Sequence, residues 1–220
     1  WKRGYNLMNI KVKQAGSPDV IISQWNCHFI INNIVYLSKN KSLDADAKEK
    51  NISPKQQAMS KFQHTAFIAL GSNLQNPKHQ VQQALEAIKS HKKIQLLKAS
   101  SLYKTAPVGY DKQDDFINAV AEIKTNLAPI ELLRSLLSIE NTFGRERPFP
   151  NAPRVLDLDL LLYDDIVMNS AELTLPHPRM HERGFVMIPL AEIAPKLTIA
   201  KHGHADELAA KCDNQGVIKI

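Results

Sequence analysis

The chain has 220 residues, of which 44% are hydrophobic and 23% charged, with a formal net charge of +6. That length is enough to bury one core of moderate size, and no apolar run approaches the roughly 20 residues that a membrane-spanning helix needs. Cys27 and Cys212 lie near opposite ends of the chain without metal-ligand spacing. This argues against a disulfide scaffold and leads us to expect a cytoplasmic protein that binds no membrane.

The basic charge is concentrated at the N-terminus. Residues 1–58 hold nine basic and four acidic side chains, a net of +5, which leaves +1 for residues 59–220. The overall charge therefore gives no reason to expect nucleic-acid binding by the main part of the chain.

Residues 1–58 differ in character from the rest of the chain. The stretch 39–57 is polar, charged and linker-like, and Met59 follows it directly. We expect residues 1–58 to be an extension outside the functional fold and residues 59–220 to form the functional domain. The alternative is that residues 20–37 form a hairpin that turns at Asn32 and Asn33.

The first half of the main domain predicts a strand, a helix and a strand region. Residues 65–70 are an apolar run stopped by a turn at Gly71. Asn76 is a plausible N-cap and Pro77 fits the first helical position, with apolar residues following at helical spacing. Residues 94–103 are expected to form the second strand region.

The second half of the main domain also predicts a strand, a helix and a strand. Residues 116–123 read as a strand, and Pro129 begins a helix that Gly144 ends, with Leu132 and Leu136 on its inward face. The next strand completes a β-α-β-β-α-β order, which predicts an α+β, ferredoxin-like fold. In it an antiparallel sheet carries both helices on one face, and loops and short helices of residues 173–199 are C-terminal additions.

That last strand, residues 153–163, carries two carboxylates in an otherwise apolar run. Alternate side chains of a strand share a face, so Asp157 and Asp159 lie on one face with Cα atoms about 6.6 Å apart. Paired oxygen ligands suit Mg²⁺, which completes its octahedron with water and substrate phosphates. The alternative is an ordinary half-exposed strand.

Three arginines surround this strand: Arg145, Arg147 and Arg154. Guanidinium groups clamp phosphate oxygens through paired hydrogen bonds, and phosphoryl transfer needs such clamps together with metal. Salt bridges to the same two aspartates are the alternative explanation.

Several ordered motifs together resemble one family, the 6-hydroxymethyl-7,8-dihydropterin pyrophosphokinases (2-amino-4-hydroxy-6-hydroxymethyldihydropteridine diphosphokinases) of folate biosynthesis. They span most of residues 65–200 and comprise residues 67–74 (FIALGSNL), 105–109 (TAPVG), 116–119 (FINA), 154–159 (RVLDLD), 176–180 (PHPRM) and 183–185 (RGF). Each motif alone is weak, but their order and spacing together are specific.

The resemblance implies transfer of pyrophosphate from MgATP to the pterin hydroxymethyl group, giving AMP. It implies that Asp157 and Asp159 hold two Mg²⁺ ions and that Arg145 and Arg154 are the catalytic arginines. The further nucleotide contacts that it implies are Glu140, Arg147, Thr174, His177 and Arg183.

The resemblance also implies a slot for a flat pterin. Phe116 and Phe185 match the aromatic pair that sandwiches the ring, Asn118 pairs with its edge, and Thr105 and Val108 supply backbone contacts. Simpler explanations are core packing for both phenylalanines and a turn histidine between prolines for His177. The expected partners are therefore two small molecules, ATP and hydroxymethyl-dihydropterin, bound by a monomer.

The chain departs from the family pattern at a few positions. Many members carry an Arg-Trp pair shortly before Arg154 that is missing here, and Glu172 stands where some have arginine. Phe116 replaces a frequent tyrosine and Ala106 a frequent proline.

Two other functions share parts of this pattern. An RNA-recognition module has the same element order, but its aromatic strand signature is absent and the two aspartates would repel phosphates without metal. A metal-dependent phosphohydrolase would use the same carboxylates but needs no pterin-shaped slot.

Overall fold

The computed structural model describes residues 10–12, 20–22, 62–109, 112–145 and 152–220. The chain divides into two compact units, Trp1–Ile52 and Ser53–Ile220. In the first, β1 (Ile10–Val12) pairs antiparallel with β2 (Val20–Ile22). The turn at Asn32 and Asn33 and the linker-like stretch 39–57 lie outside the described residues.

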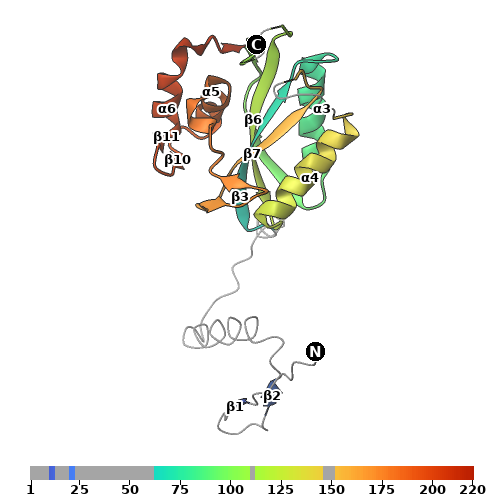
Figure 1. Ribbon diagram of the computed structural model, residues 1–220, viewed down its shortest axis with the longest axis vertical. Helices are drawn as coiled ribbons and strands as arrows, with labels where there is room; N and C mark the ends of the chain where they lie inside the picture. The colour runs from blue at the N-terminus through green and yellow to red at the C-terminus, as the bar shows by residue number, and fades with distance from the viewer. Residues whose placement is uncertain (1–9, 13–19, 23–61, 110–111, 146–151) are drawn as a thin grey trace, which may run out of the picture. The chain divides into compact units, whose positions relative to one another are not determined.

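The second unit is a mixed α/β structure built on an antiparallel sheet (Figure 1). Strand β3 (His64–Ser72) lies between β6 (Phe116–Thr125) and β7 (Asp157–Tyr163). Strands β4 (Ile94–Ala99) and β5 (Tyr103–Thr105) both pair with β6, and β12 (Ile218–Lys219) extends the sheet from β5. The predicted strand region 94–103 is thus two strands rather than one.

Among the described residues, three helices pack on this sheet, α3 (Pro77–Ser90), α4 (Pro129–Thr142) and α5 (Gly184–Ile193), and α6 (Ala205–Lys211) packs on α5. The shorter elements are β8 (Met168–Asn169), β9 (Thr174–Leu175), η3 (Met180–Glu182), β10 (Thr198–Ile199), β11 (Gly203–His204) and η4 (Asp213–Gln215). None of the helices in the described ranges is long and apolar enough to cross a membrane.

The first face of the sheet packs against α3 and α4, as the helical spacing predicts. Ile68 and Leu70 of β3 are buried together with Val81 of α3 and with Leu132 and Leu136 of α4. Both helices begin with proline, whose fixed φ and missing N–H suit the first turn.

The start of α3 differs from the expected side-chain cap. Asn76 has φ of 62° and ψ of 73°, and its side chain makes no capping hydrogen bond. Instead its carbonyl accepts a hydrogen bond from the Gln80 N–H at 3.1 Å. Asparagine is one of the few residues that tolerate this left-handed conformation.

The second face is partly covered by the C-terminal part of the chain. Helices α5 and α6 lie on the side of the sheet opposite α3 and α4 (Figure 1). Phe67 and Leu161 of the sheet are buried against Val186, Met187 and Leu190 of α5. The side chains at these sheet positions are apolar, and the free energy gained by removing them from water favours the packing of α5 on this part of the second face.

Strand β7 contains a bulge that decides which face each half of it serves. Phe67 pairs with Leu162 and Ile68 with Leu160, so Leu161 has no partner of its own on β3. Asp157 and Asp159 therefore point to the second face, while Tyr163 points to the first, where it is buried. The strand begins at Asp157, so Arg154 precedes it instead of opening it.

Glu192 ties the end of α5 to the sheet edge. Its carboxylate accepts hydrogen bonds from the Ser101 N–H (2.9 Å) and hydroxyl (2.7 Å), the Tyr103 hydroxyl (2.9 Å) and the Lys219 ammonium (2.9 Å). Partial burial opposes ionisation, but the bonds from Lys219, Ser101 and Tyr103 outweigh it and lower the pKa of Glu192 to about 2. This contact fixes α5, which carries Phe185, relative to β5, which carries Thr105.

We expect Glu192→Gln to destabilise the fold by about 2 kcal/mol at pH 7 in urea unfolding, after allowance for solvent screening. Because the folded-state pKa lies below the ordinary value of 4.5, this stabilisation is complete above about pH 4.5 and is lost as the pH falls toward 2. The difference between wild type and variant should shrink over that window. Glu86→Gln, at a surface pair with Lys89, is the control, and an equal effect there would contradict the argument.

Candidate active site

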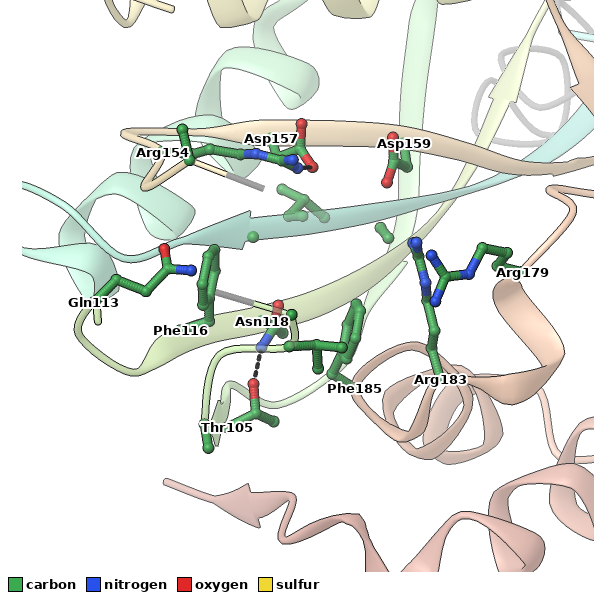
Figure 2. Close-up of a pocket in the computed structure, with 17 residues that line it drawn as sticks. Thr105, Gln113, Phe116, Asn118, Arg154, Asp157, Asp159, Arg179, Arg183 and Phe185 are labelled. Atoms are coloured by element: carbon green, nitrogen blue, oxygen red, sulfur yellow. Dashed lines mark hydrogen bonds and ion pairs between the residues drawn. The ribbon is translucent and has the colours of Figure 1, made fainter. Parts of the chain in front are cut away.

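A cavity of about 210 Å³ lies on the part of the second face that α5 leaves uncovered. Its floor comes from β3, one wall from β7 and the other from β6, the loop after β5 and the start of α5 (Figure 2). Its lining combines aromatic rings, carboxylates and guanidinium groups, a composition suited to a flat ring together with phosphates.

Two small residues on the central strand create the hollow. Gly71 of β3 pairs with Asn118 on one side and with Asp157 on the other, and Ala69 pairs with Val120 and Asp159. A Cβ atom on Gly71 would lie 3.1 Å from the Asn118 Oδ1 atom, which leaves little room for any larger residue. The register thus sets the amide of β6 and the carboxylates of β7 on opposite sides of a low floor.

Asp157 and Asp159 stand side by side along β7 and face the cavity (Figure 2). The Arg154 Nη1 atom makes an ion pair with the Asp157 Oδ2 atom. In the described ranges no three His, Cys, Asp or Glu side chains form a metal-binding group. Two carboxylate donors fit Mg²⁺, which usually takes one or two from the protein and the remainder from water and phosphates.

The opposite wall carries the aromatic pair. Figure 2 shows the Phe116 and Phe185 rings on either side of the Asn118 amide. The Asn118 Nδ2 atom donates to the Thr105 hydroxyl at 2.8 Å, and both side chains are buried. That bond fixes the orientation of the amide relative to the slot between the rings.

Most of the site residues expected from the sequence meet in this cavity. Those that line it are Thr105, Val108, Phe116, Asn118, Arg154, Asp157, Asp159, Arg183 and Phe185. Four described residues do not line it: Glu140, Arg145, Thr174 and His177. Arg147 lies outside the described residues.

Glu140 is fully buried on α4 next to β7. Its Oε1 atom accepts a hydrogen bond at 2.6 Å from the N–H of Leu158, the residue between the two aspartates. Its Oε2 atom lies 3.0 Å from the Arg145 Nε atom. Glu140 therefore holds both the edge of the carboxylate strand and one of the expected catalytic arginines.

His177 and Thr174 lie beyond the outer edge of β7. The His177 N–H donates to the Leu161 carbonyl at 2.8 Å, and the Thr174 hydroxyl donates to the Asn169 Oδ1 atom at 2.9 Å. Burial, followed by the charge of Arg183, lowers the pKa of His177 to about 4, so its imidazole is neutral at pH 7.

Three residues near the cavity were not expected from the sequence: Asn73, Gln113 and Arg179. The Asn73 Nδ2 atom donates to the Gln113 Oε1 atom at 2.9 Å, and its Oδ1 atom accepts from the Arg154 N–H at 2.7 Å. This buried amide thereby joins the loop before Phe116 to the segment before Asp157. The sequence signals for Asn73 were its position after the turn at Gly71 and its place in the family motif 67–74.

The departure at Glu172 has a structural explanation. Its carboxylate receives two hydrogen bonds from Arg134 of α4, at 2.9 and 3.0 Å. Glu172 thus pairs on the surface outside the cavity.

Comparison with known proteins identifies the family. Residues 67–195 match the model of 7,8-dihydro-6-hydroxymethylpterin-pyrophosphokinase (HPPK). The chain is 44% identical to the 2-amino-4-hydroxy-6-hydroxymethyldihydropteridine pyrophosphokinase of Haemophilus influenzae, over 71% of this chain and 98% of that protein. It is 41% identical to the protein of that name from Pseudomonas aeruginosa, over 70% of this chain and 95% of the other.

Solved structures support the same fold. The chain is similar to a Plasmodium falciparum HPPK-DHPS crystallised with pteroate, with a TM-score of 0.55 and 14% identity, over 69% of this chain. It spans 43% of that longer chain. With the motifs, the cavity and the high identity to bacterial relatives, these matches confirm the resemblance seen in the sequence: the chain belongs to the HPPK family, whose members transfer pyrophosphate from ATP to hydroxymethyl-dihydropterin in folate biosynthesis.

Proposed function

We propose that this chain carries out that reaction, binding ATP along β7 and the pterin between Phe116 and Phe185. One observation carries the proposal: the paired carboxylates and the aromatic slot face each other across Gly71 and Ala69 in one cavity. Transfer requires the pterin hydroxyl to lie beside the polyphosphate, and a shared floor of small residues permits that approach.

In the proposed reaction the pterin hydroxymethyl oxygen attacks the β-phosphorus of ATP. A new oxygen–phosphorus bond forms, and the bond from the β-phosphorus to the oxygen bridging it to the α-phosphorus breaks. AMP leaves with that electron pair, and the hydroxyl proton passes to water. The protein contributes mainly position and electrostatic stabilisation.

Asp157 and Asp159 would hold two Mg²⁺ ions with the triphosphate, which supply Lewis-acid polarisation of the phosphoryl oxygens when bound. Arg154 pairs with Asp157 in the structure and would turn to the phosphates when the carboxylate takes a metal. Arg145, held by Glu140, would add a second guanidinium from the end of α4.

The remaining predicted nucleotide contacts are proposed around the phosphates and along the nucleoside. Arg183 lines the cavity beside Asp159, and Arg147 belongs to the segment that follows Arg145. His177 and Thr174 would lie along the nucleoside, where a neutral imidazole offers hydrogen bonds without charge. Glu140 would act through Arg145 and β7, since its side chain is fully buried.

The pterin would stack between Phe116 and Phe185, a geometry that favours flat aromatic ligands. Asn118, oriented by Thr105, would pair with the polar edge of the ring. Val108 is 61% exposed at the cavity mouth and would be covered by the bound ring, together with the backbone of its loop.

We also propose a ferredoxin-like topology for the domain, together with its oligomeric state and its location in the cell. The strand order β7-β3-β6, with β4 and β5 beyond β6, supports the ferredoxin-like order expected from the sequence, followed by C-terminal additions in α5 and α6. We propose that the protein acts as a monomer in the cytoplasm.

The test of the function is an assay of AMP release from ATP and Mg²⁺ with and without hydroxymethyl-dihydropterin. We expect one AMP for each pterin consumed, and almost none without pterin. Release of inorganic phosphate without pterin would instead indicate a phosphohydrolase, and specific RNA binding without turnover would indicate a recognition module.

A chain that starts at Met59 should unfold cooperatively and keep full pterin-dependent AMP release, because no proposed ligand contact comes from residues 1–58. The measurement compares thermal unfolding and specific activity with those of the full chain. A large loss of both would show that the extension belongs to the functional fold.

A further inference from the structure

Arg179 and Arg183 form a pair at the end of the cavity next to Asp159. Both line the cavity, and Figure 2 shows their guanidinium groups close to each other and directed toward the Asp159 side. They come from the two ends of the short helix η3. That turn is anchored by Met180, which is fully buried and whose N–H donates to the His177 carbonyl at 3.1 Å.

Neither guanidinium forms an ion pair with a carboxylate in the described part of the chain, although the charge of Asp159 acts on Arg183. Three other described arginines do: Arg134 pairs with Glu172, Arg145 with Glu140 and Arg154 with Asp157. No such ion pair involves Arg179 or Arg183. Two guanidinium groups that face one cavity, neither in an ion pair within the described residues, can together bind a multiply charged anion.

The local charges agree with this interpretation. Burial lowers the pKa of Arg183, Asp159 opposes this effect, and the neighbouring Arg179 adds to it. Arg183 is partly buried whereas Arg179 is exposed, and their like charges repel each other less once an anion lies between them. A phosphate group that accepts bonds from both would reduce that repulsion.

We propose that Arg179 binds, together with Arg183, the terminal phosphate of ATP, and so recognises the diphosphate part that is transferred. This inference rests on the proposed function and adds Arg179 to its contacts. Arg154 lies at the Asp157 end of the carboxylate pair and Arg179 with Arg183 at the Asp159 end (Figure 2). The carboxylates therefore have guanidinium groups on both sides, which allows a linear polyphosphate to be held at two points.

The test compares ligands with and without the terminal phosphates. Calorimetry would measure the binding of AMP and of the non-transferable analogue α,β-methylene-ATP with Mg²⁺ to wild type, Arg179→Gln and Arg179→Lys. We expect Arg179→Gln to weaken analogue binding at least tenfold and AMP binding less than twofold. Arg179→Lys should recover part of the loss, because lysine keeps the charge but not the two-pronged geometry.

Arg134→Gln is the matched control, because it removes the same charge from an exposed position outside the cavity. It should leave both affinities unchanged. Unchanged analogue binding by Arg179→Gln, or an equal loss for AMP and analogue, would overturn the inference. Thermal unfolding would show that each variant is folded.

The experiments distinguish failure of this inference from failure of the proposed function. If wild type releases AMP only with pterin and Arg179→Gln binds the analogue normally, the inference alone fails. If wild type neither binds the analogue nor turns over with pterin, the proposed function fails, and the inference fails with it.

Discussion

Asp157→Ala and Asp159→Ala are each expected to lower turnover by about a thousandfold, equivalent to roughly 4 kcal/mol of transition-state stabilisation. The two carboxylates act on charge that develops on the phosphates, so pterin affinity should change much less than turnover. Steady-state kinetics of AMP release, with pterin binding measured separately, would show this difference.

The control for these variants is Asp165→Ala, in the exposed turn that follows the same strand. Its turnover should equal that of wild type. Near-normal turnover in either Asp157→Ala or Asp159→Ala would refute the metal assignment, provided that thermal unfolding confirms a folded protein.

Arg154→Ala is expected to change two measurements in opposite directions. Turnover should fall about a hundredfold, because one guanidinium no longer offsets charge on the phosphates. Divalent-cation binding without nucleotide should become roughly fivefold tighter, because a partly buried ion pair worth about 1 kcal/mol no longer competes for Asp157.

Titration with Mn²⁺ in the absence of ATP would measure the second effect, and Arg134→Ala would serve as the control. If Arg154→Ala binds the cation more weakly than wild type, the ion pair assists the metal site instead of competing with it. That result would contradict the proposed exchange of partners at Asp157.

The sequence predicted best those residues whose positions follow from local periodicity. It predicted less well those whose positions depend on contacts between distant segments. Alternation along β7 placed Asp157 and Asp159 on one face, the family resemblance indicated Phe116 and Asn118, and the antiparallel pairing with β3 brings them together. Helices α3 and α4 followed from apolar spacing and initial prolines. These features depend on local periodicity, which can be read from a single chain.

Other features depend on which segments meet in space, which periodicity does not record. Helix α5 covers half of the second face because Phe67 and Leu161 point there, whereas its own sequence shows no strong polar face. The carboxylate of Glu140 looked available for a ligand, yet it is buried against Leu158. Glu192 accepts hydrogen bonds from residues about 90 positions earlier in the chain.

The bulge at Leu161 lets the two ends of β7 use opposite faces of the sheet. In a regular strand the side chains of Asp157, Asp159, Leu161 and Tyr163 would all point to the same face of the sheet. If Leu161 were kept but paired regularly, either the two carboxylates would enter the apolar core or the Tyr163 ring would lie under α5, whereas deletion of Leu161 would leave both ends on their present faces. With the bulge in place, Asp157 and Asp159 face the cavity while the Tyr163 hydroxyl, on the other face, donates to the Leu127 carbonyl at 2.6 Å.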